Sequence, residues 1–131
     1  MTHMEPPRGD AEAAATRALD AALADLEETV GDPEFVAQLI GDFLDGLPAQ
    51  LDVLRAAQST RDLELLHRAA HTLKSNAATF GAERFESACR ELENAARAGQ
   101  PDAIRKLVAR VEAEATLVTA ALAVARAERS S

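Results

Sequence analysis

Apolar residues recur along this chain at alternating steps of three and four, the spacing that places them on one face of an α-helix. Residues of the turn-forming types, mainly glycine and proline, separate the periodic segments. The pattern predicts five helices, over about residues 11–30, from 33 through at least 54, and over about 61–80, 82–98 and 101–127. No stretch shows the strict alternation of a half-buried strand.

The boundary between the first two predicted helices has a clear chemical signature. Gly31 follows the last periodic residue of the first segment, as a C-terminal cap residue does. Asp32 is suited to cap the next helix, and Pro33 then occupies its first position, where no backbone N–H is needed.

Pro48 interrupts the second helix and removes one backbone hydrogen bond. The apolar pattern continues in phase beyond it, so we expect a kink rather than a break.

Each predicted helix carries one apolar stripe. The residues expected to face the core are Leu19, Leu23, Leu26 and Val30; Phe35, Val36, Leu39, Ile40, Phe43, Leu44, Leu47, Leu51 and Leu54; Leu66, Ala70, Leu73, Ala77 and Phe80; Phe85, Cys89, Leu92 and Ala96; and Ile104, Leu107, Val108, Val111, Ala115, Val118 and Leu122. Short connections force consecutive helices to lie antiparallel. The expected fold is therefore all-α, an antiparallel up-down four-helix bundle with an additional N-terminal helix that caps one end.

Length and composition restrict the domain organisation and the partners. With 131 residues the chain supports one hydrophobic core, and we expect a disordered lead at 1–10, the bundle at 11–127 and a tail at 128–131. A formal charge of −8 argues against nucleic acid as a partner. The single cysteine, Cys89, excludes an intramolecular disulfide and is expected to be a buried hydrophobe. No signal peptide or bilayer-spanning run is visible, so we expect a cytoplasmic protein without a membrane partner.

The third predicted helix contains a candidate for chemistry. His71 follows Ala70 of the buried stripe by one residue, or about 100° around the helix, which places it at the solvent edge. The residues that share its face are His67, Arg68, Lys74, Ser75 and Ala78. This face is basic, and its last two members are small. Free imidazole has a pKa of about 6.5, so much of it is neutral and nucleophilic near neutral pH.

The sequence around His71 resembles a known signature. Ala70-His71-Thr72-Leu73-Lys74-Ser75, followed by Phe80-Gly81, is similar to the His-x-Leu-Lys-Gly motif of histidine-containing phosphotransfer (HPt) domains. Further similarity lies in Gly31-Asp32-Pro33-Glu34-Phe35, Arg68-Ala69-Ala70, Gly81-Ala82-Glu83-Arg84-Phe85 and Arg90-Glu91-Leu92-Glu93. The resemblance extends from about Leu19 to Leu122. Two positions depart from it, because Ser75 stands where the family most often has glycine and Asn76 where a smaller residue is usual.

The resemblance implies a function and a set of roles. His71 would accept a phosphoryl group, through Nε2, from a receiver-domain aspartate and pass it to another receiver in a multistep phosphorelay. Lys74 would stabilise the phosphoryl group, and His67, Arg68, Ser75 and Ala78 would belong to the partner-docking face. The expected partners are receiver domains of response regulators, a hybrid histidine kinase, or both. The chain itself would be a phosphoryl carrier and not an ATP-dependent enzyme, with no cofactor of its own, and Mg²⁺ would be bound by the receiver.

Three other interpretations remain open. The chain could be a helical interaction module that binds receiver or kinase domains without being phosphorylated, although such packing does not require Lys74 or a small Ser75. It could be a fragment of a chemotaxis-type kinase, whose phosphorylated domain looks similar. The spacing of His67 and His71 could bind a metal, but two ligands are too few for a structural zinc site. We therefore predict no metal site.

Overall fold

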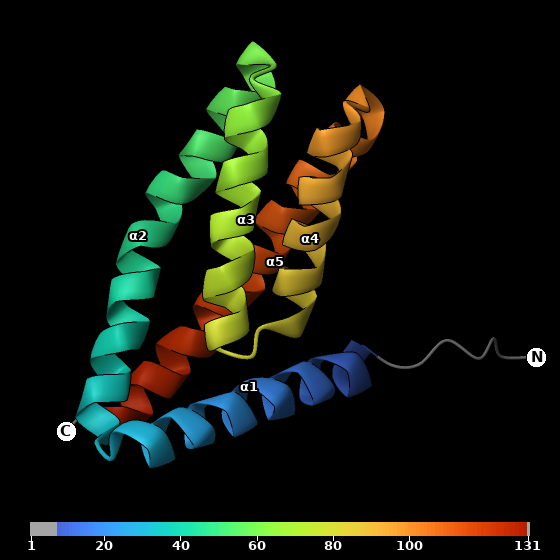
Figure 1. The fold of residues 1–131 in the computed structure, drawn as a ribbon. Coiled ribbons are helices and arrows are strands. Elements are labelled where there is room, and N and C mark those ends of the chain that lie inside the picture. Colours follow the sequence, from blue (N-terminus) through green and yellow to red (C-terminus); the bar gives the residue numbers. More distant parts are fainter. Residues whose placement is uncertain (1–7, 131) are drawn as a thin grey trace, which may run out of the picture.

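The computed structural model describes the backbone of residues 8–130 and the side chains of residues 13–130. Within this part the chain forms helices and no strands, which confirms the all-α prediction. The helices are α1 (Arg8–Val30), α2 (Pro33–Thr60), α3 (Leu63–Thr79), α4 (Glu83–Ala98) and α5 (Pro101–Arg129). Helices α2 to α5 run up and down as a four-helix bundle, and α1 lies across one end of it (Figure 1). No described helix is both apolar enough and long enough to span a bilayer.

The helix ends follow the predicted caps, with shifts of a few residues. The Asp32 carboxylate accepts a hydrogen bond from the backbone N–H of Glu34 at 2.9 Å, and α2 continues unbroken through Pro48. Helix α3 begins two residues later than predicted, because Arg61 adopts the left-handed conformation that ends α2 and Asp62 caps α3. Helix α1 begins at Arg8 and α5 ends at Arg129, so residues 8–10 and 128–129 are helical instead of lead and tail. Residues 1–7 and 131 of the predicted lead and tail lie outside the described part.

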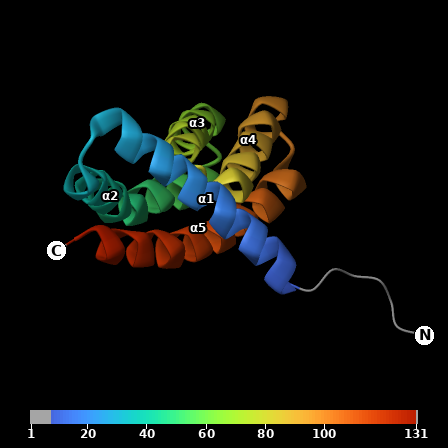
Figure 2. The same ribbon diagram turned by 90° about the horizontal axis from the view of Figure 1, so that it is seen from below.

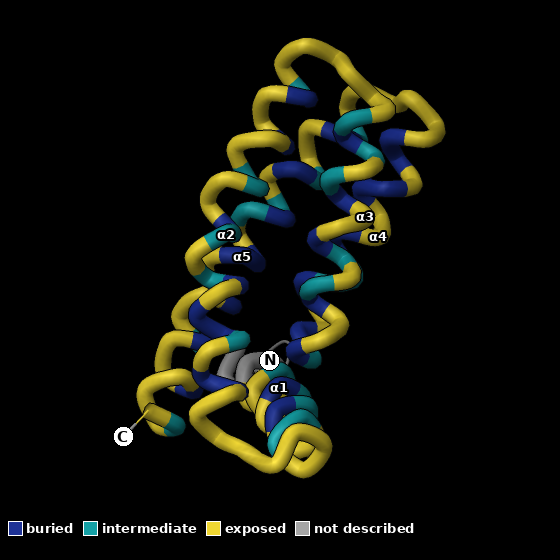
Figure 3. The backbone as a smooth tube through the Cα atoms, turned by 60° about the vertical axis from the view of Figure 1, so that its left-hand side comes forward, coloured by how far each residue is buried: buried dark blue, intermediate teal, exposed yellow. Residues whose placement is uncertain are grey.

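The core lies between α2, α3, α4 and α5, where the predicted stripes meet. Buried segments of the backbone face the interior of the bundle (Figure 3). The turns after α1, α2 and α4 are exposed, whereas the turn between α3 and α4 is largely buried. The rings of Phe43 and Phe80 lie 5.2 Å apart and join α2 to the end of α3. Two predicted core residues, Val30 and Phe35, are exposed. Both flank the turn between α1 and α2, where the apolar stripe of each helix extends beyond the part that other helices cover.

Helix α1 is held to the end of the bundle by a narrow contact. Leu19 and Leu23 are buried against the other helices, and Arg129 at the end of α5 donates a hydrogen bond to the Glu27 carboxylate at 2.8 Å. The helix crosses the bundle end diagonally, over the turn between α3 and α4 (Figure 2). Gly81 in this turn lies so close that an added Cβ would stand 2.5 Å from the Cβ of Ala22. The close approach of α1 therefore depends on a residue without a side chain.

Candidate functional site

The outer face of α3 is open to solvent, and the imidazole ring of His71 lies on it. Leu66, Ala70, Leu73 and Ala77 point into the core, as their spacing predicts. The exposed residues of the opposite face are Arg68, His71, Thr72, Ser75, Ala78 and Thr79. The His71 side chain is 57% exposed. The imidazole is therefore accessible to a large partner, because the exposed residues C-terminal to it are all small.

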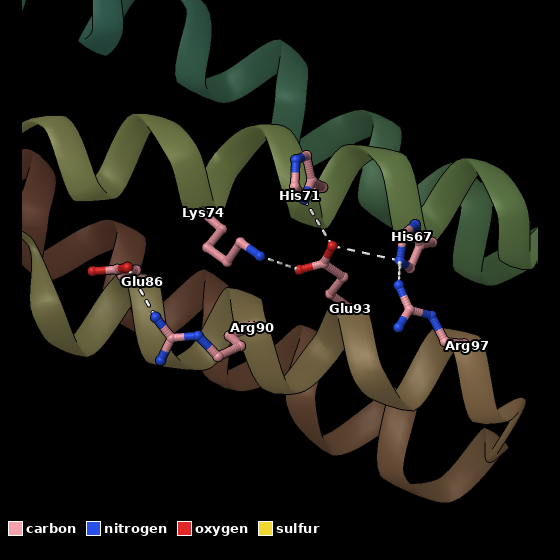
Figure 4. Close-up of polar contacts among 7 residues, drawn as sticks. All are labelled: His67, His71, Lys74, Glu86, Arg90, Glu93 and Arg97. Atoms are coloured by element: carbon pink, nitrogen blue, oxygen red, sulfur yellow. Dashed lines mark hydrogen bonds and ion pairs between the residues drawn. The ribbon is translucent and has the colours of Figure 1, made fainter.

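One edge of the His71 ring is fixed by a residue of the neighbouring helix. Its Nδ1 lies 2.8 Å from Oε2 of Glu93 on α4 (Figure 4). An ionised carboxylate can only accept hydrogen bonds, so Nδ1 must carry the proton and donate it. A neutral ring then has its lone pair on Nε2, the nitrogen that does not contact Glu93. The contact with Glu93 selects the tautomer in which the free nitrogen is a nucleophile.

Lys74 contacts the same carboxylate through its other oxygen. The Lys74 ammonium donates to Oε1 of Glu93 at 2.7 Å, and its side chain is only 24% exposed. The position one turn from His71 agrees with the predicted face, but the charge points toward α4 and not outward. The two oxygens of Glu93 are thus divided between Lys74 and the His71 ring.

Glu93 is a buried carboxylate, with 8% of its side chain exposed. Burial by itself raises the pKa of this carboxyl group. The hydrogen bonds from Lys74 and His71, with the charges of the same two residues, outweigh that effect, and the pKa lies below its ordinary value. Glu93 is therefore ionised at neutral pH and able to accept both bonds.

His67 lies one turn before His71 and faces the same part of α4. Its Nε2 is 3.4 Å from Oε2 of Glu93 and 3.0 Å from Nη2 of Arg97. Arg68, in contrast, points outward and its guanidinium is 3.4 Å from the exposed Glu64 carboxylate. The structure therefore brings His67, His71 and Lys74 together around Glu93 and leaves Arg68, Ser75 and Ala78 on the open face.

Glu93 was not among the predicted site residues, although a signal for it exists. It occupies the position next to Leu92, and it lies four residues after Cys89 and three before Ala96, all of which are buried. A charged residue at the edge of an apolar stripe is rarely buried without a partner. The sequence does not show which partner, because that depends on how α3 and α4 are rotated against each other.

The other predictions for this region concern metal binding and the cysteine. Within the described residues, no group of three or more His, Cys, Asp or Glu side chains is placed to hold a metal ion. Cys89 is fully buried on α4, as predicted. Its burial, reinforced by the charges of Glu86 and Glu93 and opposed by that of Lys74, raises the thiol pKa to about 12. This thiol is structural and not a nucleophile.

Two cavities in the described part of the chain lie away from His71. A cavity of 350 Å³ lies between α1, α4 and α5, and another of 430 Å³ lies between the start of α2 and the end of α5; His71 lines neither. An oriented nucleophile on an open helix face suits a reaction with a group that another protein presents. The arrangement leaves the Nε2 side of His71 open to a macromolecular partner.

Comparison with known proteins supports the same interpretation. Residues 38–126 match the model of one protein family, described as the Hpt domain. This segment contains α3 and α4 with the whole His71–Glu93 cluster, and α1 lies outside it. No curated protein and no solved structure matches the chain.

Proposed function

The chain belongs to the Hpt domain family, and from this premise we propose that His71 is the residue that carries the phosphoryl group. Hpt domains perform histidine phosphotransfer in phosphorelays and are phosphocarrier modules without kinase activity of their own. They interact with receiver domains and histidine kinases. The observation that supports His71 most directly is the 2.8 Å contact between its Nδ1 and Glu93, which leaves Nε2 exposed as the nucleophile.

The proposed reaction moves one phosphoryl group in two steps, from one receiver to His71 and from His71 to another receiver. The Nε2 lone pair of His71 attacks the phosphorus of a receiver's aspartyl phosphate, an N–P bond forms, and the bond between phosphorus and the aspartate oxygen breaks. In the second half a carboxylate of another receiver attacks the same phosphorus, the N–P bond breaks, and the electron pair returns to Nε2. The Nδ1 proton stays in place throughout. We propose that the Mg²⁺ for these steps is bound by the receiver, and that the chain contributes no cofactor.

Glu93 stabilises the phosphorylated state through charge. When Nε2 bonds to phosphorus while Nδ1 keeps its proton, the ring becomes an imidazolium cation. The ionised Glu93 carboxylate already accepts the Nδ1 hydrogen bond, so no reorganisation is needed as that positive charge develops. We propose that this electrostatic effect makes Glu93 part of the catalytic machinery.

We propose two roles for Lys74, one in the unphosphorylated protein and one when the phosphoryl group is present. In the unphosphorylated protein its ammonium compensates Glu93 at 2.7 Å. We retain the proposal that it also stabilises the phosphoryl group, because the ammonium lies one turn from His71 and can turn toward an anion on the open face. His67, Arg68, Ser75 and Ala78 are proposed to line the docking surface, and Ser75 and Ala78 act by being small.

The experiment that tests this function uses a panel of phosphorylated receiver domains and the variant His71→Gln. We expect label to appear on the wild-type chain as an acid-labile, base-stable adduct, and none to appear on His71→Gln. Glu93→Gln should be phosphorylated about tenfold or more slowly, the effect of losing a hydrogen bond to a charged group. Glu91→Gln is the matched control, since Glu91 lies on the same helix but bonds to Arg110 on α5.

The alternative function is that of an interaction module that is never phosphorylated. It predicts that receivers bind wild type and His71→Gln equally well and that phosphoramidate, a small phosphodonor, leaves His71 unmodified in ³¹P NMR spectra. This pair of results would overturn the proposal. Phosphorylation by phosphoramidate without transfer from any receiver in the panel would support His71 as the carrier and show that the cognate receiver is still missing.

A further inference from the structure

Helix α4 has two glutamate–arginine pairs with the same spacing. One forms an ion pair, whereas the arginine of the other contacts His67. Glu86 and Arg90 are four residues apart, the spacing at which such pairs form on a helix, and they bond at 2.9 Å. Glu93 and Arg97 repeat this spacing on the same side of α4. Within residues 8–130, however, the Glu93 carboxylate forms its ion pair with Lys74 and lies within 4 Å of the His67 and His71 rings, and no ion pair joins it to Arg97. Figure 4 shows one nitrogen of the His67 ring in contact with both Arg97 and the Glu93 carboxylate.

The contacts of His67 define its protonation. An arginine guanidinium can only donate hydrogen bonds, so His67 Nε2, at 3.0 Å from Arg97 Nη2, must accept. The ring is then neutral with its proton on Nδ1. It engages Arg97 without offering a hydrogen to Glu93, and Oε2 of Glu93 keeps its bond from His71 at 2.8 Å.

We propose that His67 is a positioning residue for the reactive histidine, which it serves by holding Arg97 away from Glu93. Without His67, Arg97 would form with Glu93 the same four-residue ion pair that Arg90 forms with Glu86. A guanidinium at Oε2 would compete with Nδ1 of His71 for that oxygen. The His71 ring would then be free to carry its proton on Nε2. In that tautomer the lone pair is on Nδ1, and Nε2, the nitrogen proposed to attack phosphorus, has none.

The effect of His67 on phosphorylation rests on the proposed phosphotransfer function. Its effect on the His71 tautomer can be measured without that function. The tautomers of His67 and His71 can be read from long-range ¹⁵N–¹H correlations of the imidazole rings in the unphosphorylated protein, at a pH where both rings are neutral. We expect the Nδ1–H form of both rings in the wild type. In His67→Ala we expect His71 to shift toward the Nε2–H form.

A set of five variants separates this role from a general structural one. His67→Ala should slow phosphorylation of His71 by phosphoramidate roughly ten- to a hundredfold, the loss expected when a charge-assisted hydrogen bond is removed. His67→Ala with Arg97→Ala removes the competitor, and the rate should return to within about twofold of that of Arg97→Ala alone. His67→Ala with Arg90→Ala is the control and should stay slow. His67→Gln should be close to wild type, because the amide oxygen can accept from Arg97.

The outcomes separate a failure of the positioning role of His67 from a failure of the proposed phosphotransfer function. If the His71 tautomer is the same in wild type and His67→Ala, or if removing Arg97 does not restore it, His67 does not act through Arg97 and the inference fails, whatever the phosphorylation data show. If the tautomer shifts and is restored as expected but His71 is never phosphorylated, the positioning role holds and the phosphotransfer proposal fails. If the alanine variant does not fold, His67→Gln still tests the inference, because a shift of its His71 tautomer away from the wild-type form would contradict it.

Discussion

Two glycines in left-handed turns offer a quantitative test of how α1 is attached. Gly31 has φ +73° and Gly81 has φ +67°, so alanine is strained at both. That strain costs about 1–2 kcal/mol at either position. A Cβ at Gly31 meets nothing within 4 Å, whereas at Gly81 it stands 2.5 Å from the Ala22 Cβ and 2.8 Å from the Ala18 carbonyl oxygen. Gly31→Ala is therefore a matched control for the contact with α1.

The additional cost of Gly81→Ala follows from what must move. Neither clashing atom belongs to a flexible side chain, so α1 as a whole has to shift. Overpacking of this kind costs about 1–3 kcal/mol. Complete release of α1 sets the upper limit, because it would expose Leu19 and Leu23, at about 1.5–3 kcal/mol for each. We expect Gly81→Ala to lose at least about 1 kcal/mol more free energy of unfolding than Gly31→Ala.

Urea unfolding followed by circular dichroism measures this difference, and native-state hydrogen exchange locates it. Both variants should unfold at lower urea concentration than the wild type, and Gly81→Ala at the lowest. In Gly81→Ala, amide protection should fall further in α1 than in α3, because α3 loses only the protection that follows from the lower free energy of global unfolding. Equal unfolding midpoints for the two variants, with α1 equally protected in both, would refute the reasoning that α1 packs directly on Gly81.

Three further predictions concern the site and its helix. Ser75→Phe should block transfer from receivers but leave phosphorylation by phosphoramidate unchanged, whereas Ser59→Phe, on the exposed end of α2, should affect neither; slowing of both donors would place Ser75 in the chemistry. Because the folded-state pKa of Glu93 is lowered from 4.5, its contribution to stability is present above that pH and is lost as the pH falls through the folded-state value. Acid titration of unfolding should therefore be shallower in Glu93→Gln, and identical curves would contradict this. Cys89, with its thiol pKa raised to about 12, should react with a thiol reagent at pH 8 only after urea is added; rapid native reaction would show that it is accessible.

The sequence by itself determined the helices and the face on which His71 lies. The three-and-four spacing is local, so it identifies the buried side of α3 through Leu66, Ala70 and Leu73 without any knowledge of neighbouring helices. The cap at Asp32 is equally local, since it depends on the N–H of Glu34 two residues away. Val30 and Phe35 were wrongly placed in the core because periodicity continues to the end of a helix even where no other helix covers it.

Only the tertiary structure decided which groups meet at His71. Glu93 is 22 residues from His71 and 19 from Lys74, and Arg97 is 30 from His67. These pairs depend on the axial register and rotation of α4 against α3, which many side chains of the core set together. The resulting contacts select the His71 tautomer and turn Lys74 inward, two properties that no local pattern contains. The chain alone therefore predicted His71 as the candidate phosphoryl acceptor, whereas the packing of two helices supplied the carboxylate that orients its ring.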